Sequence, residues 1–148
     1  FGFITLFLDF LKTFCPCLIM HKYFGTEVGV VSGFLTILGH IYPIWLKFKG
    51  GKGVASYMGF MLATSWPLFI LLIISWLFIV KIFKYSAVAA IISILINLIT
   101  FKIILFTQFN YNILLWIKGD PIEFQFILFI SIIILIKHYT NVINIFKK

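Results

Sequence analysis

Long apolar stretches separated by short polar segments dominate the chain. Four of them approach the roughly 20 residues that a helix needs to cross about 30 Å of hydrocarbon. These predicted spans cover residues 1–20, 28–46 and 86–106, and a shorter 122–136. The pattern predicts an all-α membrane protein, a polytopic transmembrane helix bundle that forms a single integral membrane domain over residues 1–148.

The stretch 56–80 lies between the second and third predicted spans and is interrupted by Thr64-Ser65-Trp66-Pro67. Proline lacks a backbone donor and disfavours helix at the residue before it. We therefore expect a broken or re-entrant hairpin near 56–80 that returns to the same side of the membrane. Residues 108–121 carry several turn-forming residues and are predicted to be a loop with a small apolar element.

Composition supports the membrane assignment. Hydrophobic residues make up 63% of the chain and charged residues 11%, against about 25% charged residues in soluble domains. This excludes an ordinary water-exposed surface, a disordered chain and a nucleic-acid-binding module. The formal net charge is +8, and an excess of lysine in a membrane protein marks loops that face the cytoplasm. The lysines expected on that side are Lys47, Lys49, Lys52, Lys81, Lys84, Lys137, Lys147 and Lys148.

Asp9 and Lys12 lie inside the first predicted span, three residues apart. Isolated charges are costly in hydrocarbon, and residues three apart are neighbours on a helix, so we expect the two to pair. A purely structural pair and a role in shaping a site both remain open. Gly25, Gly29 and Gly33 recur every four residues, a spacing that predicts a face for close helix packing.

A segment rich in glycine and lysine follows the second span. Gly50, Gly51 and Gly53 surround Lys52, so backbone N–H groups could converge on an anion while the lysine adds charge. The segment is not a nucleotide-binding P-loop, because Gly53 stands where that motif needs Ser or Thr and Leu46 stands where it needs its first glycine. A positively charged cytoplasmic turn is the alternative.

His138 and Asn141 follow the last predicted span and are three residues apart, so both would project from one helical face. An interfacial histidine without further role is the alternative. A zinc site would require His21, His40 and His138 to converge, and we expect no metal site.

With these residues in view, the chain resembles the PlsY family of bacterial membrane acyltransferases. Gly39, His40 and Pro43, followed by residues 48–55, match the family's second motif, G-H-x-x-P-x-x-x-x-F-K-G-G-K-G-V-A. This match is long and specific, and the whole chain follows the order of the family's later motifs.

Three further segments carry the resemblance. Residues 9–16 are similar to a D-x-L-K-G-x-x-P helix, with Thr13 in place of the glycine. Ser86 stands near the position of a family serine, which aligns with Ala87. Residues 138–148 resemble the third motif, H-R-x-N-I-x-R-L-x-x-G-x-E, but both arginines are replaced and the chain stops before the glutamate.

The resemblance implies an enzyme that transfers an acyl group from acyl phosphate to glycerol-3-phosphate and gives lysophosphatidic acid, the first step of membrane phospholipid synthesis. It implies catalytic roles for His138 and Asn141. It implies phosphate contacts from His40, Lys49, Gly50, Gly51, Lys52, Gly53 and Ser86. The expected location is the bacterial inner membrane, multi-pass, with the motif loops in the cytoplasm. The expected partners are the two substrates and membrane lipids, without a cofactor, a nucleic acid or an oligomer.

The family's first helix and its first motif, G-S-x-N-x-G-A-T-N, have no counterpart in the chain. The chain is therefore expected to be an N-terminally truncated acyltransferase or an inactive remnant of one. A transporter component or a subunit of a membrane complex is the alternative from another class, in which Asp9 and Lys12 would line a pathway. The order of the motifs favours the acyltransferase.

Overall fold

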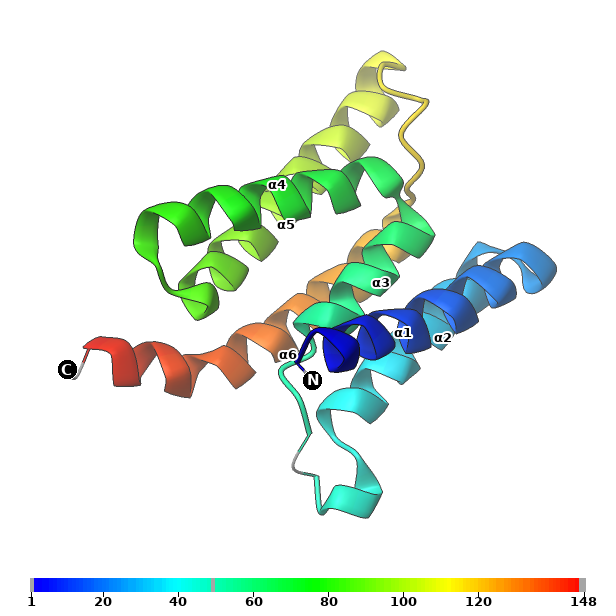
Figure 1. Ribbon diagram of the computed structural model, residues 1–148. Coiled ribbons are helices and arrows are strands. Elements are labelled where there is room, and N and C mark those ends of the chain that lie inside the picture. Colours follow the sequence, from blue (N-terminus) through cyan, green and yellow to red (C-terminus); the bar gives the residue numbers. More distant parts are fainter. Residues whose placement is uncertain (1, 49, 147–148) are drawn as a thin grey trace. The chain divides into compact units, whose positions relative to one another are not determined.

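The structure is a computed structural model that describes residues 2–48 and 50–146, and only the backbone of residues 3, 140–142 and 144–146. Every regular element in these ranges is helical (Figure 1). The elements are α1 (Gly2–Phe24), α2 (Thr26–Ile41), the 3-10 turn η1 (Ile44–Leu46), α3 (Val54–Thr64), α4 (Trp66–Phe83), α5 (Ser86–Tyr111) and α6 (Pro121–Phe146). The chain separates into two compact units, residues 1–66 and 67–148, which are described separately below.

Within the described residues, five segments are long and apolar enough to cross a membrane. They are Ile4–Phe24, Thr26–Leu46, Trp66–Phe83, Ser86–Tyr111 and Pro121–Tyr139. The four predicted spans are confirmed. The fifth, α4, was not among the predicted spans. Its Pro67 lies in the first helical turn, where a missing N–H breaks no intrahelical hydrogen bond, so the proline does not shorten the helix.

The predicted break near Ser65 is confirmed. Helix α3 ends at Thr64, and Ser65 is extended, with φ −147° and ψ 99°, before α4 begins at Trp66. The two helices belong to different units, so the return of the chain to the same side of the membrane stays a prediction.

In the first unit, α1, α2 and α3 pack through glycines. A side chain at Gly29 would collide with the backbone of His21, and one at Gly33 would collide with the ring of Phe60. The predicted packing face is therefore confirmed for Gly29 and Gly33. Gly25 has a different role, because its φ of 94° makes the turn between α1 and α2.

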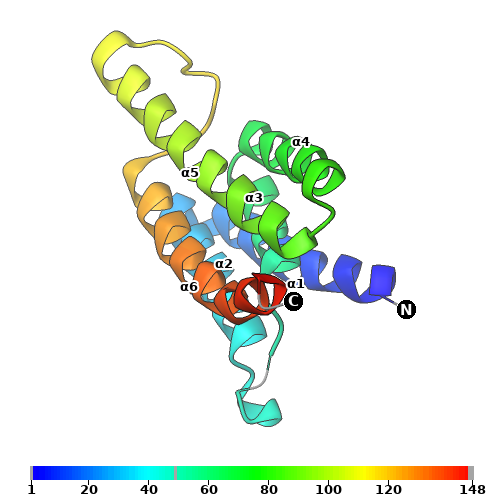
Figure 2. The same cartoon turned by 90° about the vertical axis from the view of Figure 1, so that its left-hand side faces the viewer.

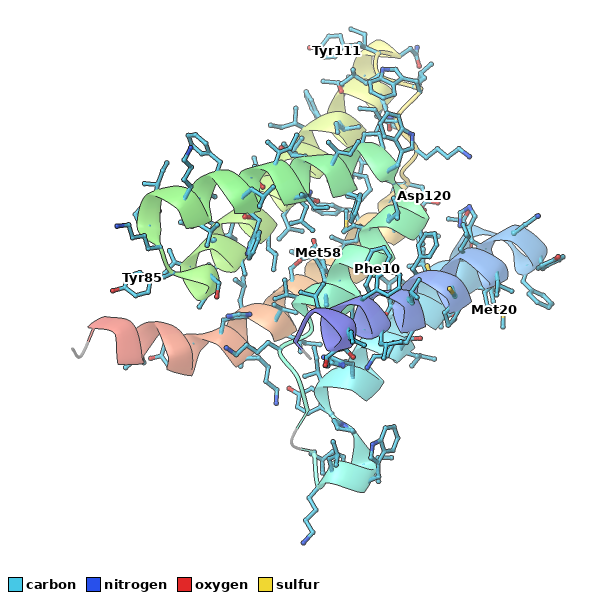
Figure 3. All side chains as sticks on the ribbon, viewed as in Figure 1. Phe10, Met20, Met58, Tyr85, Tyr111 and Asp120 are labelled. Carbon is cyan, nitrogen blue, oxygen red and sulfur yellow. The ribbon has the colours of Figure 1, made fainter. Side chains whose placement is uncertain are left out.

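Helix α3 also lies close against α1. A side chain at Gly59 would collide with the carbonyl of Phe10, and Figure 3 labels Phe10 and Met58 on the two helices that meet there. The hydroxyl of Ser56 donates to the Asp9 carbonyl at 3.2 Å. These contacts fix the start of α3, and with it the end of the loop that precedes it, onto α1.

The turn at Gly25 makes α1 and α2 antiparallel neighbours (Figure 1). Asp9 lies 16 residues before Gly25 and Ile41 lies 16 residues after it. The first third of α1 therefore lies beside the end of α2. This register places Asp9 and Lys12 next to the segment that enters the glycine-rich loop.

The second unit contains α4, α5 and α6. The Phe101 and Phe124 rings of α5 and α6 meet edge to face at 5.7 Å, and the buried Asn97 of α5 donates to the Leu68 carbonyl of α4 at 2.7 Å. A hydrogen bond between helices is useful in a membrane, where an unpaired polar group is costly. The unit is thus held together by aromatic packing and a polar link.

The connection between α5 and α6 differs from its prediction at its first end. Helix α5 continues through residues 108–111, and the loop covers 112–120 (Figure 2). Gln108 explains the difference, because its side-chain amide donates to two carbonyls of that loop. At the other end the Glu123 amide donates to the Asp120 carboxylate at 2.9 Å and the Asp120 amide donates to the Glu123 carboxylate at 3.1 Å, a capping box that starts α6.

Candidate phosphate-binding site

The loop between α2 and α3 extends past the end of α2 and contains the turn η1 (Figure 2). The amide of Phe48 donates to the Pro43 carbonyl at 3.0 Å. Lys47 and Phe48 both have left-handed backbones, with φ of 52° and 61°, a conformation that costs about 1–2 kcal/mol per residue other than glycine. Such strain is often found at functional sites. Lys49 lies outside the described residues.

Gly50 and Gly51 both lack room for a side chain, and Gly51 does not have a positive φ. A side chain at Gly50 would collide with the carbonyls of His40 and Ile41, and one at Gly51 would collide with the imidazole of His40. Gly53 differs, because its φ of 83° favours glycine by backbone conformation. Glycine is therefore favoured at these positions for two separate reasons, space and backbone conformation, while the binding of an anion by their amides stays a prediction.

Helix α3 begins directly after this loop. Gly53 provides no side-chain cap, and the amides of a first helical turn have no acceptor within their own helix. Lys52 is exposed beside them. The amide of Gly51 is already engaged, because it donates to the His40 carbonyl at 3.2 Å. An anion at this place would therefore meet the first-turn amides of α3 and the Lys52 ammonium group.

Three polar side chains meet behind the loop. The Lys12 ammonium nitrogen lies 2.7 Å from Asp9 Oδ1, which confirms the predicted pair. The same nitrogen lies 2.7 Å from His40 Nδ1, and His40 Nδ1 lies 3.3 Å from Asp9 Oδ1. The link to His40 was not predicted. The signal that could have revealed it is the hairpin register around Gly25, which brings positions 9–12 beside position 40.

The remaining predicted site residues belong to the second unit. Ser86 is the first residue of α5 and is exposed. His138 is buried within α6, and Asn141 lies on the same helix with a side chain outside the described set. Both residues lie on one helix, as expected, because α6 continues to Phe146 without an interrupting glycine or proline. Their approach to the glycine loop stays a prediction.

Comparisons with known proteins cover the whole chain. The model of the glycerol-3-phosphate acyltransferase family matches residues 1–148. The glycerol-3-phosphate acyltransferase of Anaplasma marginale (strain Florida) is 37% identical over 144 residues, which cover 97% of this chain and 66% of that protein. The one of Ehrlichia canis (strain Jake) is 31% identical and is covered over 69% of its length. The chain thus spans about two thirds of the length of these relatives.

Two crystal structures of PlsY (YgiH), an integral membrane glycerol 3-phosphate acyltransferase, are similar to this chain. The lysophosphatidic acid form matches with a TM-score of 0.83 and 30% identity, and the glycerol 3-phosphate form with 0.84 and 29%. The matches cover 99% of this chain and 69% and 68% of those chains. Together with the five apolar helices, they identify a multi-pass integral membrane protein.

Proposed function

The chain belongs to the glycerol-3-phosphate acyltransferase family, and from this premise we propose that it transfers an acyl group from acyl phosphate to glycerol-3-phosphate. The product is lysophosphatidic acid, the first intermediate of membrane phospholipid synthesis. The observation that carries the proposal is the loop at Gly50–Gly53, which follows the family's motif and leaves Lys52 beside the uncapped start of α3.

The proposed reaction needs no cofactor. A hydroxyl oxygen of glycerol-3-phosphate attacks the carbonyl carbon of acyl phosphate and forms an ester bond. The bond between that carbon and the phosphate oxygen breaks, and the hydroxyl proton leaves with inorganic phosphate. Because phosphate is a good leaving group, the protein chiefly has to align the reacting groups and to neutralise negative charge.

In this proposal the glycerol-3-phosphate phosphate binds at the start of α3. Lys52 supplies charge, the α3 amides supply oriented donors, and His40 supports the loop from behind. His138 and Asn141 act on the reacting groups, and Lys49 and Ser86 add contacts to phosphate. The motif loops face the cytoplasm in a bacterial inner membrane, where the positive charge of Lys47 and Lys52 is favoured.

A transporter component is less well supported. That alternative needs Asp9 and Lys12 to face a pathway, whereas they contact each other and His40. Their pairing accounts for two charges inside a membrane span without any transported ion.

The donor is tested with protein expressed from its whole reading frame and reconstituted in lipid nanodiscs. We expect lysophosphatidic acid from acyl phosphate and glycerol-3-phosphate, and none when acyl-CoA replaces acyl phosphate. Product formation from acyl-CoA alone would refute the proposed donor. Absence of product with either donor would refute the activity.

The phosphate site is tested with Lys52→Ala. Loss of one partner of a desolvated charged contact costs about 2–5 kcal/mol, which corresponds to roughly 30-fold or more in affinity. We expect the KM for glycerol-3-phosphate to rise by about this factor while the thermal unfolding midpoint stays unchanged. Lys22→Ala is the matched control, because Lys22 is exposed at the far end of α1. An unchanged KM in Lys52→Ala would mean that the loop is only a turn.

A further inference from the structure

The contact of Asp9 and Lys12 with His40 joins two polar groups of α1 to the base of the glycine loop. The side chains of Asp9 and His40 are partly buried, at 23% and 13% exposure, whereas that of Lys12 is exposed, at 42%. The two shortest contacts share the Lys12 nitrogen, which lies 2.7 Å from both the carboxylate and the imidazole. A single ammonium group therefore holds two partners.

This arrangement determines which imidazole nitrogen carries the hydrogen. A lysine ammonium group has three donors and no acceptor. His40 Nδ1, at 2.7 Å from it, must therefore accept. In a neutral imidazole one nitrogen accepts and the other donates, so the hydrogen lies on Nε2.

The opposite edge of the imidazole faces the loop. A side chain at Gly51 would collide with Nε2, and its Cβ would lie 2.7 Å from Cε1. The backbone of His40 holds the same residue, because the Gly51 amide donates to the His40 carbonyl. Thus His40 contacts Gly51 through both its ring and its backbone, directly before Lys52.

We propose that Asp9 and Lys12 are positioning residues that hold His40 in its Nε2–H form against Gly51 and thereby set the loop that takes a phosphate monoester. This inference rests on the proposed function for the identity of the ligand. Asp9 compensates the charge of Lys12 within the span, Lys12 orients the imidazole, and His40 fixes the backbone from which Lys52 projects.

The tautomer is tested directly by nitrogen NMR of protein with 15N-labelled histidine in nanodiscs, with the His40 signals assigned by their loss in His40→Asn. We expect an unprotonated Nδ1 and a protonated Nε2. We also expect Lys12→Met to remove this preference. A protonated Nδ1 in the wild-type protein would overturn the proposal.

Loop order is tested by hydrogen exchange of residues 50–53 and by the kinetics for glycerol-3-phosphate. We expect Lys12→Met to raise the exchange rate of the Gly51 amide and the KM at least tenfold, with kcat changed less than threefold. Lys12→Arg, which keeps a donor, should restore both. Lys22→Met is the matched control on the same helix and should behave as wild type.

A double variant separates positioning from simple charge compensation. Asp9→Asn with Lys12→Met leaves no unpaired charge in the span. We expect it to keep the fast Gly51 exchange and the raised KM, because His40 still lacks its donor. Recovery of wild-type values in the double variant would overturn the proposal, as would unchanged values in Lys12→Met. If the protein shows no acyl transfer, the proposed function fails, while the NMR and exchange measurements still decide the positioning role.

Discussion

Gly51→Ala is the sharpest perturbation of the loop, because it adds one methyl group at the contact with His40. The backbone of Gly51 does not have a positive φ, so alanine is allowed there by conformation and the effect must come from space. The added Cβ would lie 2.7 Å from His40 Cε1, whereas carbon atoms in favourable contact lie about 3.5–4.0 Å apart. The imidazole or the loop must therefore move by roughly 1 Å.

The imidazole cannot move away from Gly51 freely. Its other edge is held by Lys12 at 2.7 Å, and a hydrogen bond to a charged group contributes about 1.5–3 kcal/mol. Losing it corresponds to roughly 10- to 150-fold in the equilibrium that forms the loop. We expect Gly51→Ala to weaken glycerol-3-phosphate binding by a factor in this range, measured by calorimetry in nanodiscs.

A double-mutant cycle with His40→Ala identifies the cause. The three atoms nearest to the new methyl group all belong to the His40 imidazole, so Gly51→Ala should cost less than about threefold once that ring is removed. Gly2→Ala is the control for the substitution itself, because a side chain there meets nothing within 4 Å. The reasoning is refuted if Gly51→Ala costs the same with and without His40, or if it costs nothing in the wild-type protein.

Three further predictions concern contacts within the first unit or within the second unit. Gly33→Ala should lower the free energy of unfolding by about 1–3 kcal/mol relative to Gly39→Ala on the same helix, because only the former collides with Phe60; equal unfolding in SDS would contradict this. Asp120→Ala should cost about 0.5–2 kcal/mol through loss of the α6 cap, whereas Asp120→Asn should remain near wild type in the same assay. Asn97→Ala should cost about 0.6 kcal/mol through loss of its bond to α4, and an unchanged midpoint would show that the bond adds nothing.

Hydropathy predicted the helices because burial in hydrocarbon requires long apolar segments with satisfied backbones. The ends of these helices were predicted less well, and for physical reasons. The segment 108–111, which contains Gln108 and Asn110, suits either a loop or the last turn of a helix. It is helical in the structure, because the Gln108 side-chain amide donates to two carbonyls of the following loop. Pro67 marked a real break, but the sequence did not show that the helix beyond it has the length of a span.

The glycines show the same limit at the candidate site. The sequence places glycine at 33, 51 and 53 without saying what each one does. In the structure Gly33 makes room for Phe60 and Gly51 for the His40 imidazole, while Gly53 adopts a positive φ. Only the role of Gly33, on the packing face between helices, follows from a four-residue spacing. The roles of Gly51 and Gly53 depend on a loop conformation that neighbouring side chains determine.

The pairing of Asp9 with Lys12 was predictable because both residues lie on one helix, three positions apart. Their contact with His40 was not predictable, because it requires the chain to reverse at Gly25 and requires helical segments of nearly equal length on either side of that turn. An α-helix turns by about 100° per residue, so a shift of one residue in either arm would direct His40 away from Lys12. The two segments that resemble family motifs, residues 9–16 and 39–55, are therefore parts of one structural unit. The turn at Gly25 and the close packing at Gly29 and Gly33 set its register.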